Sequence, residues 1–483
     1  MMNRKSLSLK LVGAIFLVPV LLACGAPAGG FADVAALRQA AEKGDAKAQT
    51  QLGILYYEGR GVLQHYGNAA LWLKPAAEQG EILAQRVLGL MYINGQGLRA
   101  DPVQGAKWLT HAADAGDATA QTEAGLLFTQ GNGVAKDLAR AAVYFRKAAD
   151  QGVTVAQRNL GVLYLKGWGV KQDYPQAAIW LGKAAERGDV QSQNELGWLL
   201  SSGLAGRQDT GEALKWFRQA AEKGEPTAQK NLGILYFYGN GVKQNDTEAR
   251  QWFKKAADAG NPQAHYYLGL MASRGRGTVT NLTAAVEHYR QAAALGDPTA
   301  QNELGWAYDT GAGVKADEKE AAQWYRKAAE AGLAIAQHNY GVMCANGRGM
   351  KADEAAAFKW YLKAAEQGLV RSQNEVGWRY DQGKGVEQDP KAALQWFQKA
   401  AAANLDLAQY NLGIFFANGK GTAKDLVEAH KWFNLAAAQG NTNAVNNRQF
   451  LLQQLTPEQV NEAQKRAADF LAELEKRSAP ASK

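Results

Sequence analysis

The chain has 483 residues, of which 47% are hydrophobic and 21% are charged, and this composition excludes a globally disordered protein. The formal charge of +8 is spread along the chain without a basic run, which argues against a nucleic-acid partner. The two cysteines, Cys24 and Cys344, are too few for a cysteine metal cluster. We therefore expect stability to come from packing alone.

The first 23 residues have the pattern of an export signal. Arg4, Lys5 and Lys10 precede an uncharged apolar run over 11–22, which is too short to span a membrane but has the length of a signal-peptide core. We therefore predict a signal peptide over 1–23 and an exported protein.

The sequence Leu-Leu-Ala-Cys that ends at Cys24 resembles a bacterial lipobox, in which the cysteine is lipidated and becomes the mature N-terminus. This resemblance implies a membrane anchor at Cys24 and a short tether over 24–31. Because Gly25 is not the aspartate that retains many such proteins in the inner membrane, we expect an outer-membrane lipoprotein that faces the periplasm or the surface. The alternative is cleavage after the small residues at 26–28, which would release a soluble periplasmic or secreted protein.

A helix over 32–44 is predicted next, followed by eleven units of 36 residues over 45–440. Such strict self-similarity predicts a solenoid, in which each unit buries its apolar face against its neighbours. One glycine recurs every 36 residues and marks the units. It is preceded by leucine in most of them and is here called the Leu-Gly glycine: Gly53, Gly89, Gly125, Gly161, Gly197, Gly233, Gly269, Gly305, Gly341, Gly377 and Gly413.

Each unit contains two amphipathic segments, so we predict a helix pair, with a first helix A that ends at a Gly-x-Gly turn and a second helix B. Aspartates at the start of helix B are expected to cap it rather than to bind a metal. They are Asp101, Asp137, Asp173, Asp317, Asp353, Asp389 and Asp425. The large aromatic residues of helix B are expected in the core, namely Trp180, Trp216, Trp252, Trp324, Trp360, Trp396 and Trp432.

A C-terminal cap is predicted over 441–476 and a disordered tail over 477–483. Thr456, Pro457 and Gln459 form a capping box for a last helix. Apolar residues of that helix, such as Ala467 and Phe470, are expected to cover the open end of the stack.

The pattern A-x-x-x-L-G-x-x-Y-x-x-G-x-G-V, followed by D, A, W, K-A-A and G, resembles the Sel1-like repeat over residues 32–476. This relative of the tetratricopeptide repeat implies an all-α, right-handed α/α superhelical solenoid with helix A on the concave side. The resemblance also implies that members of the family act as adaptors, scaffolds or host-interaction factors, and it implies no single activity for this chain. The turn over 203–206 departs from the pattern and predicts one altered loop.

The strings QNELGW and QNEVGW place a tryptophan at one register of helix A, in Trp198, Trp306 and Trp378. At 100° per residue, this position lies opposite the leucines that pack within the pair, so we predict a partner-binding concave face. Its other members are Asn194, Asn302, Asn374, Asp309, Asp381, Lys230, Phe237, Tyr266 and Tyr410. An apolar residue follows the Leu-Gly glycine in every unit, which predicts a nearly continuous apolar stripe. The alternative is that these residues pack between neighbouring units.

No catalytic motif is present, and the six histidines are widely spaced in the chain. We therefore predict a non-enzymatic protein without a cofactor or a bound metal. The expected function is a monomeric interaction scaffold of the bacterial envelope that binds a protein, or a glycan or peptidoglycan-associated partner. The alternative is a secreted or surface host-interaction factor of an immunoglobulin-binding kind.

Overall fold

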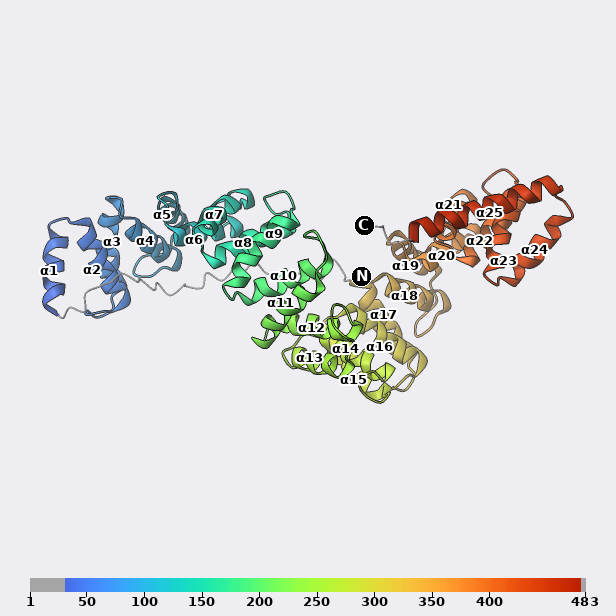
Figure 1. The fold of residues 1–483 in the computed structure, drawn as a ribbon, viewed down its shortest axis with the longest axis horizontal. Helices are drawn as coiled ribbons and strands as arrows, with labels where there is room; N and C mark the ends of the chain where they lie inside the picture. The colour runs from blue at the N-terminus through green and yellow to red at the C-terminus, as the bar shows by residue number, and fades with distance from the viewer. Residues whose placement is uncertain (1–30, 479–483) are drawn as a thin grey trace. The chain divides into compact units, whose positions relative to one another are not determined.

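The computed structural model describes residues 31–478, and helices are the regular secondary structure throughout this range (Figure 1). The predicted signal peptide, Cys24 and the last five residues lie outside the described part. No helix among the described residues is both long and apolar enough to cross a membrane. The chain divides into two compact units, with the boundary after Trp252, and each unit is described by itself.

The helices follow the predicted pairs, with even-numbered A helices and odd-numbered B helices. The first unit contains α1 Phe31–Glu42, α2 Ala46–Glu58, α3 Tyr66–Glu78, α4 Ile82–Asn94, α5 Pro102–Asp114, α6 Ala118–Gln130, α7 Leu138–Asp150, α8 Thr154–Lys166, α9 Tyr174–Glu186, α10 Val190–Ser202, α11 Thr210–Glu222 and α12 Pro226–Tyr238. The boundary lies within α13 Asp246–Asp258.

The second unit continues the same alternation to the end of the described chain. It contains α14 Pro262–Arg274, α15 Leu282–Ala294, α16 Pro298–Thr310, α17 Glu318–Glu330, α18 Ala334–Asn346, α19 Glu354–Glu366, α20 Val370–Gln382, α21 Pro390–Ala402, α22 Asp406–Asn418, α23 Leu426–Ala438, α24 Thr442–Leu452 and α25 Pro457–Ser478. The A helices from α2 to α10 in the first unit and from α14 to α22 in the second each pack against the B helix that follows, so the fold is a solenoid of stacked helix pairs.

The turns between the two helices of a pair show why the units begin and end where they do. Helix α16 ends at Gly311, whose left-handed φ of 76° lets its N–H donate to the Ala307 carbonyl oxygen. A Cβ at Gly313 would collide with the backbone of Leu282 in the preceding pair. Asp317 then accepts hydrogen bonds from two backbone N–H groups of α17, at 3.0 Å. Both glycines and the aspartate are therefore required by local geometry.

The predicted aspartate caps are confirmed throughout the array. Each side chain accepts a hydrogen bond from the backbone N–H three residues later, at Asp101, Asp137, Asp173, Asp317, Asp353, Asp389 and Asp425. His65 takes the same role through Nδ1, which accepts from the N–H of Asn68 at 3.0 Å.

The core lies between the two helices of each pair, and it corrects the expectation for the helix B tryptophans. Trp180 and Trp432 are buried, but most of the others are half-buried. The fully buried side chain is the residue after the tryptophan, such as Phe217 or Phe397, which packs against the Leu-Gly glycine of helix A. The tryptophan is turned toward the surface, where a lysine three residues later covers the ring, as Lys399 does at 3.9 Å from Trp396.

The C-terminal segment forms a packed helix, as expected. The capping box is confirmed, because Thr456 and Gln459 exchange backbone-to-side-chain hydrogen bonds of 3.0 and 3.3 Å. Helix α25, labelled in Figure 1, packs against α23. The ring centroids of Phe470 on α25 and Trp432 on α23 lie 5.4 Å apart. Ala467 is buried in this contact, so α25 covers α23, the last B helix of the array, whereas Phe450 on α24 is 63% exposed.

Candidate functional site: an aromatic groove on the A helices of the second unit

The residue after the Leu-Gly glycine, here named the groove position, is exposed only where it is a large aromatic. Trp306 is 47% exposed and Trp378 is 38% exposed. Six of the eight aliphatic residues at this position are buried, namely Ile54, Leu90, Leu126, Val162, Ile234 and Leu270, and the other two, Val342 and Ile414, are half-buried. The predicted continuous apolar stripe is therefore wrong for the described chain, and the exposed aromatic surface is local.

Trp306 lies beside a pocket of about 440 Å³ that is formed within the second unit. Helices α14, α15, α16 and α18 supply its walls. Ile335 and Leu282 are the exposed apolar side chains that line it with Trp306. The polar lining includes Asn302, Asn339, Glu303, Arg274 and Tyr289. The pocket is thus an inter-repeat groove with an aromatic side chain at its rim.

The three predicted asparagines are buried and lie between repeats. The side chains of Asn194, Asn302 and Asn374 each accept a hydrogen bond from an asparagine amide on the next A helix. The donors are Asn231 at 3.0 Å, Asn339 at 2.9 Å and Asn411 at 3.0 Å. These amides hold adjacent A helices in register and, in α16, also line the Trp306 pocket.

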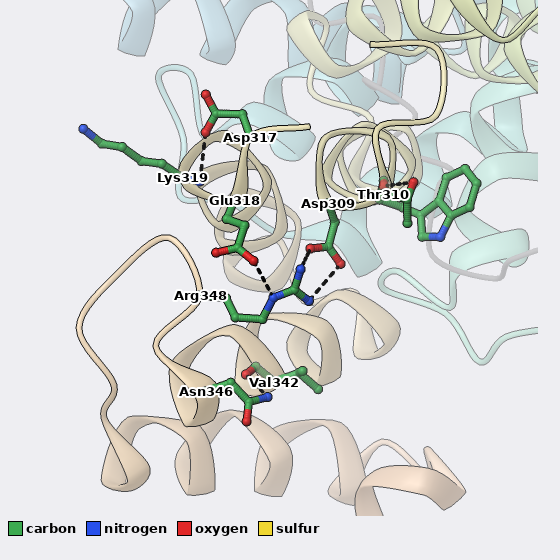
Figure 2. Close-up of polar contacts among 9 residues, drawn as sticks. Asp309, Thr310, Asp317, Glu318, Lys319, Val342, Asn346 and Arg348 are labelled. Carbon is green, nitrogen blue, oxygen red and sulfur yellow. Dashed lines mark hydrogen bonds and ion pairs between the residues drawn. The ribbon is translucent and has the colours of Figure 1, made fainter. Parts of the chain in front are cut away.

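The two predicted aspartates form ion pairs with the turn of the next repeat. Figure 2 shows Arg348 between Asp309 and Glu318, with nitrogen–oxygen distances of 2.5 and 2.9 Å. Asp381 pairs in the same way with Lys420 at 3.0 Å. Both carboxylates are therefore already paired within the protein. They link neighbouring repeats and are not free acceptors for a ligand.

The remaining predicted site residues lie at different depths. Lys230 and Phe237 are buried in the first unit, and burial lowers the pKa of Lys230 to about 8. Tyr266 and Tyr410 are half-buried and pack against aromatic rings of the following B helix. Trp198 is also half-buried and packs on a cluster that includes Leu199. The structure therefore brings Trp306 together with Asn302 at the pocket and places both exposed groove-position tryptophans, Trp306 and Trp378, in the second unit.

Two apolar residues that were not predicted belong to the same surface. Ile335 on α18 is 38% exposed and Leu407 on α22 is 45% exposed, and both are the second residue of their helix. Most other A helices have a polar residue there, for example Gln191, Thr299 or Arg371, and the exceptions are the half-buried Leu83 and Val155. An unusual apolar residue at a normally polar register was the signal that could have identified them.

Burial raises the pKa values of two carboxyl groups at the groove. Burial raises the pKa of Glu303, which Arg274 partly offsets, and burial likewise raises the pKa of Glu375 against the nearby Arg379. Burial also raises the pKa of Tyr289 to about 12, and its hydroxyl lies 3.3 Å from Ser273 Oγ. Within residues 31–478, no group of three or more His, Cys, Asp or Glu side chains is arranged to hold a metal.

The stacked helix pairs, their glycine turns and the inter-repeat asparagines define the class of α-solenoid repeat proteins. The model of the Sel1 repeat matches eleven consecutive segments, 46–81, 82–117, 118–153, 154–189, 190–225, 226–261, 262–297, 298–333, 334–369, 370–405 and 406–441. The chain therefore belongs to the Sel1 repeat family, as its sequence pattern predicted. Proteins of this family are generally non-catalytic scaffolds, and such repeat folds typically bind protein partners.

Solved structures of other Sel1 repeat proteins are similar to this chain. A protective antigen present in uropathogenic Escherichia coli strains is 35% identical with a TM-score of 0.62, and the match covers 93% of this chain and 98% of that one. A Sel1 repeat protein of Oxalobacter formigenes is 34% identical with a TM-score of 0.47, and the match covers 52% of this chain and all of that one. A search of the curated proteins found no match.

Proposed function

We propose that this protein is a non-catalytic scaffold of the bacterial envelope that binds a protein partner on the A-helix groove of its second unit. The observation that carries this proposal is the exposure of Trp306 and Trp378 at a position where six of the eight aliphatic residues are buried and the other two, Val342 and Ile414, are half-buried. Exposed aromatics beside a pocket are typical of binding surfaces, and truncation of such a hot spot costs about 2 kcal/mol or more.

The envelope part of the proposal rests on the sequence that ends at Cys24. A lipid on Cys24 would hold the array at the outer membrane by a short tether. Cys24→Ala is expected to move the protein from the membrane fraction to the soluble fraction. If the variant stays with the membrane, the lipid anchor is wrong.

A secreted host-interaction factor is the second candidate. It is supported by the 35% identity to the protective antigen of uropathogenic Escherichia coli strains, which covers almost the whole of both chains. This candidate predicts processing that is insensitive to globomycin, followed by release into the medium. The anchored scaffold predicts that globomycin blocks processing.

The binding groove is tested by site-specific cross-linking in the native bacterium. A photoreactive amino acid at Ile335 would lie on the pocket wall, whereas one at Leu295 would lie on an exposed turn outside the pocket. We expect a discrete protein adduct from position 335 but not from position 295. The captured protein should bind the purified full chain and should lose binding to the double variant Trp306→Ala, Trp378→Ala. Equal capture from both positions, or binding that is unchanged in the double variant, would contradict the proposal.

A further inference from the structure

The residue pattern around the exposed tryptophans of the second unit recurs after 72 residues, which is two Sel1 repeats. Helix α16 carries Asn302, Glu303, Trp306 and Asp309, and α20 carries Asn374, Glu375, Trp378 and Asp381 at the same registers. The intervening helices α18 and α22 lack the tryptophan and have Val342 and Ile414 at the groove position. The surface thus consists of two copies of a two-repeat pattern.

The two copies are held together by the same polar contacts. In the first copy, Asn339 donates to Asn302 at 2.9 Å and Arg348 pairs with Asp309 at 2.5 Å. The second copy repeats both contacts, with Asn411 donating to Asn374 at 3.0 Å and Lys420 pairing with Asp381 at 3.0 Å. Each tryptophan helix is therefore fixed to the next A helix at two points, and this limits the freedom of the groove between them.

Each copy also presents an exposed aliphatic residue from the following helix. Ile335 lines the pocket of Trp306, and Leu407 has the same register relative to Trp378. In most of the other A helices this register is polar. The exposed surface at each copy therefore combines one indole with one aliphatic side chain.

The polar chemistry of the groove favours a polypeptide over a glycan. A sugar-binding aromatic needs nearby side chains that can bind hydroxyl groups, but the asparagines and aspartates beside these tryptophans are engaged between repeats. The exposed side chains that the two copies share are one indole and one aliphatic group each, and these suit large apolar side chains.

The charges at the groove point to an acidic partner. The carboxylates of Asp309 and Asp381 are paired, and Glu303 and Glu375 are half-buried, which raises the pKa of both glutamates. Arg274 and Arg371 on the A helices are exposed. Lys384, whose Nζ lies 5.7 Å from the Trp378 ring, is also exposed and lies 3.9 Å from a carboxylate oxygen of Glu354. The accessible charge along this face is thus mainly positive.

The spacing of the copies sets the length of the bound segment. Adjacent packed helices are about 10 Å apart, so two helix steps separate the tryptophans by about 20 Å. An extended chain rises about 3.3 Å per residue, and about six residues cover that distance. We propose that the second unit binds an acidic, extended polypeptide at two equivalent positions, each taking one large apolar side chain, with the two side chains about six residues apart. This inference rests on the proposed binding function of the same groove.

The test is a selection from a displayed library of random 16-residue peptides against the purified full chain. We expect enriched peptides to carry two large apolar residues about six positions apart in an acidic context. Trp306→Ala and Trp378→Ala should each weaken binding of a selected peptide by about 30-fold. A peptide that lacks one apolar residue should become insensitive to one of the two substitutions. Leu295→Ala, an exposed apolar residue outside the groove, is the matched control and should leave binding unchanged.

The outcomes separate this inference from the proposed function. Peptides with a single apolar anchor, or peptides that depend on one tryptophan alone, would overturn the two-position inference and leave the groove as the binding site. Enrichment of basic peptides would overturn its charge assignment. Peptides indifferent to both substitutions would overturn the inference and count against the proposed function. A selection without binders, together with tryptophan-dependent binding on a glycan array, would replace the polypeptide by a sugar.

Discussion

The Leu-Gly glycine is the residue on which the packing of each helix pair depends. A Cβ built at Gly377 lies 2.8 Å from the ring of Phe397, which is fully buried and has no space to move. We therefore expect Gly377→Ala to lower the free energy of unfolding by about 1–3 kcal/mol, measured by urea denaturation. Gly182→Ala is the control, because this helical glycine has no neighbour within 4 Å of the built Cβ. It should instead stabilise the chain by about 0.5–1 kcal/mol, and equal destabilisation by both variants would contradict the packing account.

Two buried glutamates of the first unit predict a dependence of stability on pH. Burial raises the pKa of Glu123 to about 7, although the positive charge of Arg86 acts to lower it. Burial also raises the pKa of Glu195 to about 7, although Lys166 and Lys230 act to lower it. A carboxyl whose pKa is higher in the folded state binds protons more tightly when folded, so its stabilising effect is present at low pH and is lost as the pH rises from about 4.5 to 7.

The measurement compares melting temperatures of the wild type and the double variant Glu123→Gln, Glu195→Gln between pH 5 and 7.5. Glutamine has no charge to desolvate, so the variant should gain stability relative to the wild type as the pH rises through this window. A difference between the two proteins that is independent of pH would show that these carboxyls do not titrate as described.

At the scale of the elements, the asparagine bonds between A helices are expected to fix their register. Asn374→Ala removes the acceptor of the Asn411 amide at a buried position, and this should cost about 1–3 kcal/mol of unfolding free energy. Asn411→Ala in the same chain should add less than its separate cost, since the two residues act as a pair. Additive costs in this double-mutant cycle would contradict the pairing. Asn346→Ala, an exposed asparagine of α18, serves as the control with little effect.

The helix pairs could be predicted from the sequence because each unit carries its own local signals. Glycines that need a left-handed φ and aspartates that cap helix B act within a few residues, so the 36-residue period was sufficient to place the helices. The depth of a groove-position side chain could not be predicted in this way. Leu270 and Trp306 share one register, but the first is buried and the second is exposed, whereas Val342 and Trp198 at that register are both half-buried, so the residue type alone does not set the depth.

The asparagines show a second limit of the sequence. Their type and register predicted a polar exposed face, but their partners lie 37 residues away on the next A helix, and these contacts bury them. A helical projection of one helix contains no information about the helix beside it. The repetition of the motif at multiples of 36 residues is visible in the sequence. The structure adds a physical reason for it in the second unit, where the asparagine of the motif accepts a hydrogen bond from the A helix of the next repeat.

At the scale of the whole molecule, the array ends where the sequence no longer permits another helix pair. Helix α24 has Arg448 and Gln449 where α22 has Leu412 and Gly413, and Gly413 leaves the space that Phe433 of the next helix fills. A glutamine at that register obstructs the corresponding approach of a B helix. The chain instead adds α25 against α23, which explains why Phe450 at the groove position of α24 stays exposed.

The groove-binding account is tested most directly by the affinity of the cross-linked partner for the purified full chain. The double variant Trp306→Ala, Trp378→Ala should weaken this affinity by at least about 100-fold, because it removes two aromatic anchors. Both tryptophans are substantially exposed, so the melting temperature should change little. Leu295→Ala should bind as the wild type does. An unchanged affinity in the folded double variant would contradict the account.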